Sequence, residues 1–521
     1  MVETLLLLDE AKERIINGKI LLIKWKSSNS IKFHDFGVIL NEYKLFVQRI
    51  GLVGITNILI TISGLIFIPI ITKNLSTADM GYWALVSTII ALIPNIANLG
   101  LPYTMVRFLS AEKDKNKIKE SFYSMLVLVF VISLLISGIF LIFQDLIANS
   151  IFGGNLEIVY ITAIISFFAC MNLMLISFFR TFQQIKKYSI FLILQTYIGV
   201  VISSYLVLAN YNIQTVIIGL LIANLAVFVM MFILIFGHLG LAIPKFRYLK
   251  EELEFAIPTI PGNVSSWVVD SSDRIIIGVF LGSAAVGCYT PSYALGSILL
   301  MFLSPFALLL PSILPKYFDE GNFEKVSVFL KYSMKYFLLI TIPAAIGLSI
   351  LSKQVLIIIS NPEIAMNGYL VTPFVCLGAI LMGMYGIINN ILILEKKTKI
   401  LGNIWIIVGI LNLIFTIIAV PYIGIIGAAL VTLICYFIAF IITSFYSKKY
   451  FELPFEYKSL AKTILAAVIM GIFILFVNPT DQISTVITII VAIPIYFGIL
   501  FLIKGIEKEE FEFFKEMIGE N

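Results

Sequence analysis

Long apolar stretches alternate with short polar segments along most of the chain. A helix needs about 20 consecutive apolar residues to cross the hydrocarbon core of a membrane. Fourteen segments fit that requirement, and the connections between them are too short to form an external domain. The pattern therefore predicts an all-α integral membrane protein with about fourteen transmembrane helices. The expected spans are 50–72, 80–104, 122–143, 156–178, 189–209, 213–237, 255–281, 285–313, 333–352, 368–392, 400–420, 424–446, 459–478 and 483–503.

Composition supports the same class. Of the 521 residues, 60% are hydrophobic and 13% are charged, whereas about a quarter of the residues in a soluble protein are charged. The two histidines and four cysteines show no metal-ligand spacing, and the sequence contains no pattern typical of a nucleophile triad or a glycine-rich phosphate loop. We therefore expect no metal, no cofactor, no nucleic-acid partner and no enzymatic activity.

The distribution of basic residues predicts the orientation in the membrane. Of the 36 Lys and Arg residues, 33 lie in the first 49 residues, in alternate loops or in the C-terminal segment. Lys73 and Lys353 fall on the other side, and Arg274 lies inside a span. Because cytoplasmic loops are enriched in Lys and Arg, we expect a multi-pass protein of the cell (cytoplasmic) membrane with both termini cytoplasmic. A basic cytoplasmic leader would cover 1–48, and a cytoplasmic tail would cover 506–521.

The chain also repeats itself. Residues 75–83 align with 281–289 at an offset of 206, so that Gly81 corresponds to Gly287, and Gly219 corresponds to Gly427 at nearly the same offset. Six spans separate the copies, which predicts parallel repeats about an axis along the membrane normal. Transporters built in this way place the substrate path between the two halves. The expected domains are a six-helix bundle over 49–250, a second six-helix bundle over 251–450 and two additional transmembrane helices over 451–505.

The most informative segment is the seventh expected span, which is apolar but carries Asp270, Asp273 and Arg274 near its middle. Ionised side chains at the centre of a membrane helix cost about 2.5–3.5 kcal/mol each on insertion scales. At about 100° per residue, Asn263 and Ser266 share a helix face with these three charged residues. The opposite face is apolar. The segment therefore predicts a helix that turns one side toward a wet cavity or a buried ion pair.

Four segments resemble a known family. The sequence GLIFIPIITKNLSTADMGYW (64–83) is similar to the first hairpin of polysaccharide (O-antigen-type) flippases, which belong to the multidrug/oligosaccharidyl-lipid/polysaccharide exporter superfamily. The segments NLGLPYTMVRFL (98–109), FFRTFQQIKKY (178–188) and SDRIII (272–277) followed by VGCY (286–289) resemble the same family. The resemblance covers about 50–450. It implies a flippase that passes an isoprenoid-diphosphate-linked oligosaccharide from the inner to the outer leaflet by alternating access, for surface polysaccharide or glycan assembly.

The sequence departs from two relatives of that family. Peptidoglycan lipid II flippases resemble this fold but keep several arginines on spans one, two and eight, whereas the interiors of those spans hold none here. The multidrug antiporter branch typically has an acidic residue deep in span one, where this chain has Asn57. Both departures favour the polysaccharide branch.

The resemblance gives the polar residues candidate roles. A planar guanidinium binds two diphosphate oxygens at once, so Arg274, Arg107 and Arg180 are candidates for the substrate diphosphate. The alternatives are membrane anchoring by positive residues for Arg107 and Arg180, and a structural ion pair for Arg274. Asp270 and Asp273 are candidates for coupling transport to an ion, with a path driven by the lipid gradient as the rival.

Sugars are bound by amides and hydroxyls, so five further residues are candidates for lining a sugar-binding cavity. The alternative for each amide is a hydrogen bond between helices. The candidates are Asn95, Asn98, Asn263, Ser266 and Asn389.

We expect a lipid-linked oligosaccharide and membrane lipid as partners, with glycan-assembly proteins as a further candidate. Two other functions stay open. One is a cation-coupled exporter of small amphiphiles on the same fold, of the multidrug type, and the other is a membrane scaffold within a glycan-assembly complex. A net cationic cavity would favour the diphosphate lipid, a net anionic cavity would favour organic cations, and a dry interface between the halves would favour the scaffold.

Overall fold

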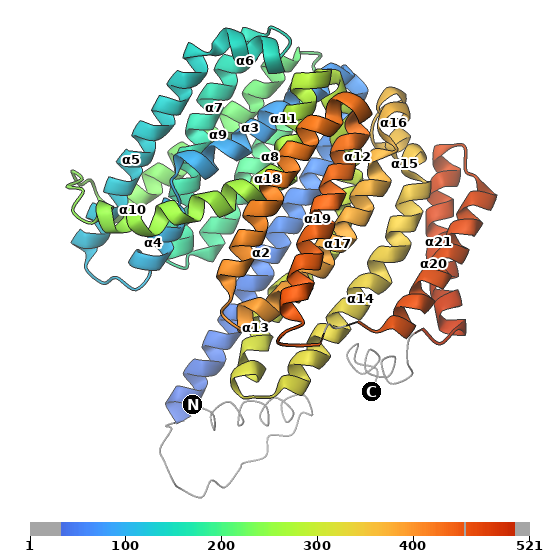
Figure 1. The fold of residues 1–521 in the computed structure, drawn as a ribbon. Coiled ribbons are helices and arrows are strands. Elements are labelled where there is room, and N and C mark those ends of the chain that lie inside the picture. Colours follow the sequence, from blue (N-terminus) through green and yellow to red (C-terminus); the bar gives the residue numbers. More distant parts are fainter. Residues whose placement is uncertain (1–32, 453–454, 506–521) are drawn as a thin grey trace, which may run out of the picture. The chain divides into compact units, whose positions relative to one another are not determined.

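The structure is a computed structural model that describes residues 33–452 and 455–505 (Figure 1). The described residues from Leu52 onward belong to one compact unit, and residues 33–51 belong to another. Most of the expected leader and the expected tail over 506–521 lie outside the described residues. The helices are α2 (Phe33–Asn74), α3 (Thr77–Ala97), α4 (Leu101–Leu109), α5 (Lys115–Ile142), α6 (Gln144–Ile151), α7 (Leu156–Thr181), α8 (Ile185–Leu208), α9 (Ile213–Leu239), α10 (Leu249–Ala256), η1 (Ile257–Thr259), α11 (Ile260–Leu281), α12 (Ser283–Ser297), η2 (Ile298–Leu303), α13 (Ser304–Asp319), α14 (Phe323–Ile350), α15 (Ser352–Ile359), α16 (Pro362–Gly368), α17 (Val371–Leu394), α18 (Thr398–Ile423), α19 (Ile425–Ser447), α20 (Tyr457–Val477) and α21 (Gln482–Leu502).

Within the described part of the chain, 13 helical segments are long and apolar enough to cross a membrane. α11 adds a further helix of 22 residues, whose sequence includes the charged residues Asp270, Asp273 and Arg274. The prediction of an all-α membrane protein with about fourteen spans is therefore confirmed.

The predicted span 80–104 is wrong at its end, because α3 stops at Ala97 and α4 begins as a separate helix at Leu101. Leu99 and Gly100 have φ values of 49° and 75°. A left-handed backbone cannot continue a right-handed helix, so the chain turns at this point. Sequence periodicity does not detect the turn because the apolar pattern continues through it.

Prolines divide two other expected spans. The segment before α11 forms the short 3-10 helix η1, with Pro258 inside it and Pro261 in the first turn of α11. Proline has no backbone N–H and cannot complete the regular hydrogen-bond ladder. The eighth span is likewise divided into α12, η2 and α13, and Pro305 lies in the first turn of α13.

Helix packing within Leu52–Asn521 forms several apolar clusters. The largest cluster joins α3, α4, α5, α7, α8 and α9 and includes residues of α11 and α12. A second cluster joins α14, α17, α18 and α19 with part of α11 and α13. A third joins α14 with α20 and α21, which lie side by side (Figure 1). α11 contacts α3, α12 and α18, so it takes part in both of the larger clusters.

Candidate functional site

A cavity of about 740 Å³ opens where α4 and the end of α7 meet α10, η1 and the start of α11. Three of its residues, Arg107, Arg180 and Asn263, are among the predicted site residues. None of the described residues that line it carries a carboxylate, so its charged lining is cationic. The lining residues are Tyr103, Val106, Arg107, Ser110, Arg180, Phe255, Thr259 and Asn263.

The two arginines of this cavity are held differently. Arg180, in the last turn of α7, donates from Nη2 to the carbonyl oxygen of Pro102 at 3.5 Å, and its Cζ lies 5.7 Å from the centre of the Tyr103 ring. Tyr103 in turn donates from its hydroxyl to Oδ1 of Asn263 at 3.4 Å. Arg107, in the last turn of α4, is exposed. The site therefore combines one oriented guanidinium with one that is open to a ligand.

The turn between α3 and α4 positions this wall of the cavity. Gly100 lies so close to η1 that an added methyl group would overlap Oγ1 of Thr259 and the carbonyl oxygen of Ala256. Further along α4, Thr104 donates from Oγ1 to the carbonyl oxygen of Glu252 at 3.3 Å. Only glycine combines this close approach with a φ of +75° at no steric cost. The local sequence thus fixes α4 against α10 and brings Arg107 to the cavity.

A second polar cluster lies further along α11. Asp273 is completely buried and forms an ion pair with Nη1 of Arg274 at 3.0 Å. The hydroxyl of Tyr289 on α12 donates to Oδ2 of Asp273. The Arg274 guanidinium also lies over the Tyr293 ring, with Cζ 4.6 Å from the ring centre. These contacts satisfy Arg274 and Asp273 within the protein and form the structural pair that was the alternative for Arg274.

Asp270 is exposed, whereas Asp273 is buried. Its Oδ1 accepts a hydrogen bond of 2.9 Å from the hydroxyl of Tyr436 on α19. Arg274 donates to the backbone carbonyl of Asp270 at 2.9 Å, but its ion pair is with Asp273. Of the two carboxylates, Asp270 is therefore the more exposed.

The structure separates the three predicted arginines into two groups. Arg274 is eleven residues beyond Asn263 on the same helix, which corresponds to about 16 Å along the helix axis. Arg107 and Arg180 share the cavity, whereas Arg274 is not among its lining residues. The Arg274 side chain retains 13% exposure and is already paired.

Four of the five predicted sugar-binding residues lie outside this cavity. Asn98 is buried and donates to the carbonyl oxygen of Cys170 at 3.1 Å, so it joins α3 to α7 instead of facing solvent. Asn95 and Ser266 donate to carbonyl oxygens of their own helices. Asn389 accepts from Nδ2 of its neighbour Asn390 at 3.3 Å.

Sequence reasoning missed four tyrosines. Tyr103 lies four residues before Arg107 on α4, and residues four apart share a helix face, so the spacing alone could have predicted that Tyr103 lies near the arginine. Tyr289 and Tyr293 are also one turn apart, next to the repeated glycine segment. Tyr436 lies 166 residues from Asp270, and no local pattern connects the two.

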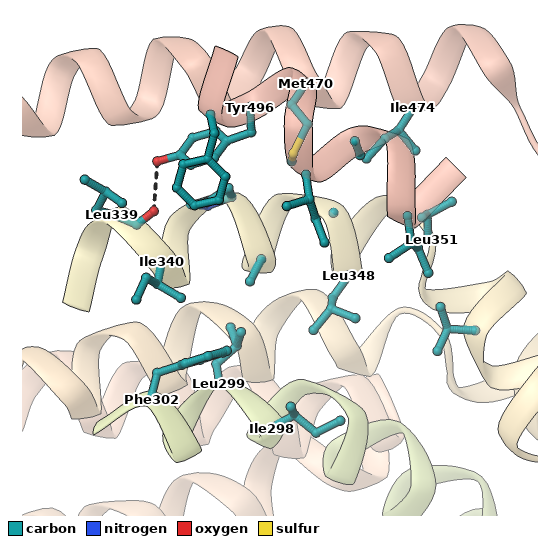
Figure 2. A pocket seen from close by; sticks show the side chains of 18 residues that line it. Ile298, Leu299, Phe302, Leu339, Ile340, Leu348, Leu351, Met470, Ile474 and Tyr496 are labelled. Atoms are coloured by element: carbon teal, nitrogen blue, oxygen red, sulfur yellow. Dashed lines mark hydrogen bonds between the residues drawn. The ribbon is translucent and has the colours of Figure 1, made fainter. Parts of the chain in front are cut away.

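A different cavity, of about 380 Å³, lies between η2, α14, α20 and α21 (Figure 2). Figure 2 shows apolar side chains such as Ile340, Leu348 and Met470 around it, with the Tyr496 hydroxyl bonded to the carbonyl oxygen of Leu339 at 2.8 Å. None of the described lining residues is charged. This cavity suits hydrocarbon and offers nothing that would bind a diphosphate.

Glu252 is a buried acid next to the cationic cavity. It lies on α10 and is 2% exposed, and its backbone carbonyl accepts the bond from Thr104. Burial raises the pKa of Glu252 above its ordinary value, and the nearby carboxylates Glu251 and Glu120 add to this, while Ser121 and Lys117 oppose it. The folded protein therefore binds a proton at Glu252 more tightly than the unfolded chain does.

Residues 46–315 match the family described as Polysaccharide biosynthesis protein, and residues 258–418 match the family described as MatE. Among curated proteins, the chain is similar to a probable low-salt glycan biosynthesis flippase of Haloferax volcanii, with 21% identity over 49% of this chain and 54% of the relative. The chain spans about half the length of the curated relatives it matches.

Two solved structures share the fold. A lipid II flippase in an inward closed conformation aligns with a TM-score of 0.71 at 21% identity, over 85% of this chain and 97% of that protein. An inward-facing multidrug resistance MATE family transporter aligns with a TM-score of 0.60 at 15% identity, over 75% and 94%. The Haloferax volcanii relative and these two solved proteins are named as flippases or transporters, not as enzymes.

We predict that Asp273→Asn lowers the free energy of unfolding by about 3–5 kcal/mol, because removing one partner leaves the Arg274 charge buried and unpaired. Asp270→Asn should lower it less, because Asp270 is exposed and an amide oxygen can still accept the bond from Tyr436. Denaturant unfolding in detergent micelles measures both. Replacing both members of the pair, as Asp273→Leu with Arg274→Met, should recover much of the loss. Equal stability of Asp273→Asn and the wild type would contradict the assignment of a buried pair.

The raised pKa of Glu252 leads us to predict that the stability of the folded protein depends on pH. Because its pKa is raised in the folded state, its contribution to stability is greatest below the ordinary glutamate pKa and is lost as the pH rises through the folded value. Glu252→Gln should therefore raise the melting temperature at neutral pH and flatten the melting-temperature profile above pH 4.5. Glu254→Gln, on the exposed side of the same helix, is the control. An unchanged profile in Glu252→Gln would refute the prediction.

Proposed function

The chain belongs to the polysaccharide biosynthesis protein family, and on this premise we propose that it is a flippase for a lipid-linked oligosaccharide. Its substrate would be an isoprenoid-diphosphate-linked oligosaccharide, carried from the inner to the outer leaflet by alternating access for the assembly of a surface polysaccharide or another glycan. The observation that carries this proposal is the cavity with Arg107 and Arg180 as its charged lining.

The charge of the substrate explains why such a cavity is needed. A diphosphate must cross about 30 Å of hydrocarbon, and an unpaired charge in that medium is strongly unfavourable. In a water-filled cavity lined by cationic side chains, contacts with these groups compensate for the hydration that the diphosphate loses, while the lipid tail stays in the bilayer. Arginine suits this role because its fork matches the oxygens of a phosphate.

The contacts within the cavity suggest different roles for its residues. Arg180 is oriented by Pro102 and Tyr103 before any substrate arrives, so it would fix the position of the diphosphate. Arg107 is exposed and free to turn toward an incoming phosphate. The Tyr103 ring and the Asn263 amide are suited to the first sugar, by stacking and hydrogen bonding respectively.

The basic loops support a cytoplasmic position for this cavity, since Arg107 and Arg180 lie at the ends of helices that continue into them. Both termini are then cytoplasmic as well. In this proposal, residues 49–250 and 251–450 are the two bundles that move relative to each other, and 451–505 adds two helices at one edge.

Asp270 is the residue proposed to couple transport to an ion. Arg274 neutralises Asp273, which leaves Asp270 as the carboxylate able to take up a proton or a metal cation from solvent. Transport driven only by the lipid gradient is the rival. The difference in accessibility between the two carboxylates favours coupling through Asp270.

A cation-coupled exporter of small amphiphiles is the second candidate function. It is favoured by the match of residues 258–418 to the MatE family and by the exposed carboxylate of Asp270. Against it stands the cationic lining of the cavity, which would repel organic cations.

We predict that Arg107→Gln lowers the initial flipping rate about 10- to 100-fold, because a hydrogen bond to a charged group contributes about 1.5–3 kcal/mol. Arg107→Lys keeps the positive charge but not the planar guanidinium, so its flipping rate should fall between those of the wild type and Arg107→Gln. The assay uses proteoliposomes with a fluorescent isoprenoid-diphosphate oligosaccharide. Arg247→Gln, with a side chain 65% exposed and outside the cavity lining, is the control and should match the wild type. A normal rate in a folded Arg107→Gln variant would remove the basis of the proposal, and transport of a lipophilic organic cation instead would favour the exporter.

The coupling role of Asp270 predicts a separate result. Asp270→Asn should abolish the acceleration of flipping by an imposed proton or sodium gradient while leaving the protein folded. The same vesicles, assayed with and without each gradient, give the measurement. If flipping by Asp270→Asn still depends on the gradient, Asp270 is not the coupling group.

A further inference from the structure

The segment between α9 and α10 crosses the start of α5 without forming a helix or strand of its own. Residues 240–246, which we call the linker, are non-helical throughout. At one end, the hydroxyl of Tyr123 on α5 donates to the carbonyl oxygen of Gly240 at 3.0 Å. At the other end, the backbone N–H of Phe246 donates to Oγ of Ser124 at 3.3 Å. Both ends of the linker are therefore tied to adjacent residues of α5.

These bonds place the linker at the edge of the membrane. α9 is apolar and long enough to cross a membrane, and it ends at Leu239, directly before the linker. Tyr123 and Ser124 are among the first residues of the span expected over 122–143. The linker thus lies at the level where two apolar spans reach the headgroups of the bilayer.

The side chains of the linker alternate between the protein and the outside. Ala242 packs against the largest apolar cluster, whereas Leu241 and Ile243 on either side of it are 68% and 86% exposed. Phe246 is 45% exposed and has a φ of 56°, a left-handed conformation that a bulky residue keeps only when its surroundings hold it there. Three large apolar side chains therefore face outward from one short segment.

Two cationic side chains lie beside this apolar patch without a carboxylate partner. A methyl group added to Gly240 would lie 3.3 Å from Nζ of Lys119, so that ammonium group reaches the linker. Lys245 is exposed within the linker itself. Among the described residues, neither lysine forms an ion pair, whereas nearby Lys117 and Arg247 are paired with Glu112 and Glu120 respectively.

We propose that the linker is an anchor for anionic phospholipids of the membrane in which the protein lies. Leu241, Ile243 and Phe246 enter the boundary between headgroups and acyl chains, and the ammonium groups of Lys119 and Lys245 bind lipid phosphates. Apolar burial and attraction to anionic headgroups act together in this mode of surface binding. The inference does not depend on which substrate the protein carries.

The membrane fits this patch better than a protein partner does. On α9, Ile233 and Phe236 are 61% and 37% exposed, which suits a helix that faces lipid. Leu241 and Ile243 continue this exposed apolar surface past the end of the helix, to the level of the headgroups. The unpaired lysines at that level match the charge of anionic lipid, so one partner satisfies both parts of the patch.

The test measures the depth of a nitroxide spin label on Ile243→Cys in lipid nanodiscs, which leave both membrane faces open. The native cysteines are buried and are replaced by alanine. The discs contain phosphatidylcholine alone or with one quarter phosphatidylglycerol. Collisions are measured with oxygen, which enters lipid, and with a neutral nickel chelate, which stays in water. Oxygen should dominate at Ile243→Cys, and phosphatidylglycerol should lower the nickel collision rate there about fivefold, as anionic lipid draws the lysines to the surface.

Charge and position are controlled separately. Lys119→Gln with Lys245→Gln should abolish the difference between the two lipid mixtures, whereas Lys448→Gln with Lys449→Gln, which removes the same charge after α19, should preserve it. A label on Tyr211→Cys is the positional control, because Tyr211 is 51% exposed in the turn before α9 and residues 209–212 hold no Lys or Arg. Phosphatidylglycerol should not change the nickel collision rate at that label.

Three results would overturn the proposal. Nickel collisions at Ile243→Cys as frequent as at Lys113→Cys, in the exposed loop before α5, would show that the linker lies in water. Infrequent collisions with both reagents would show that a protein or a second copy covers it. Equal nickel collision rates in the two lipid mixtures would show that anionic lipid is not selected.

A second measurement uses the wild-type chain, in case the variant without cysteines does not fold. Trypsin cleaves after exposed Lys245 in the linker and after exposed Lys113 in the loop before α5. In nanodiscs with phosphatidylglycerol, cleavage after Lys245 should slow about fivefold relative to cleavage after Lys113 in the same digest, because bound lipid covers the linker. An unchanged ratio of the two cleavage rates would refute the anchor.

Discussion

The structure depends on how it neutralises charge within apolar surroundings. Asp273 is fully buried and is stabilised by Arg274 beside it and by the Tyr289 hydroxyl from α12. Desolvating such a pair is costly, so it is tolerated only when the geometry is good and the remaining polar atoms are bonded. The pair therefore constrains the rotation of α11 and its contact with α12. That rotation in turn decides which other residues of α11 face open space.

The same helix carries three environments in sequence. Near its start, Asn263 faces the cavity that holds Arg107 and Arg180. Two turns later, Asp270 is exposed but fixed by Tyr436. One turn beyond, Asp273 is buried and the Arg274 guanidinium lies over the rings of tyrosines from α12. α11 contributes residues to both of the larger apolar clusters, so all three environments lie on the helix that the two clusters share.

Glycine determines how closely the helices meet at both ends of α3. Gly100 allows the turn before α4 to rest on η1, and Gly81 allows α3 to meet α12. These two contacts use different properties of the residue: a left-handed φ at Gly100 and the absence of a side chain at Gly81. The close packing of α4 on η1 and of α3 on α12 thus depends on the absence of a side chain at these glycines, because an added Cβ atom would overlap the neighbouring backbone.

The sequence by itself determined the class of the protein, nearly all of its spans and the unusual character of α11, because hydrophobic length and helical periodicity are local properties. It also placed Arg107, Arg180 and Asn263 among the candidates. Only the tertiary structure decided that these three share a cavity while Arg274 is paired elsewhere, that Asn98 bonds to α7, and that Tyr436 holds Asp270. Those outcomes depend on contacts between residues up to 166 positions apart. Helical periodicity fixes the face on which a residue lies, but the packing of other helices decides what that face meets.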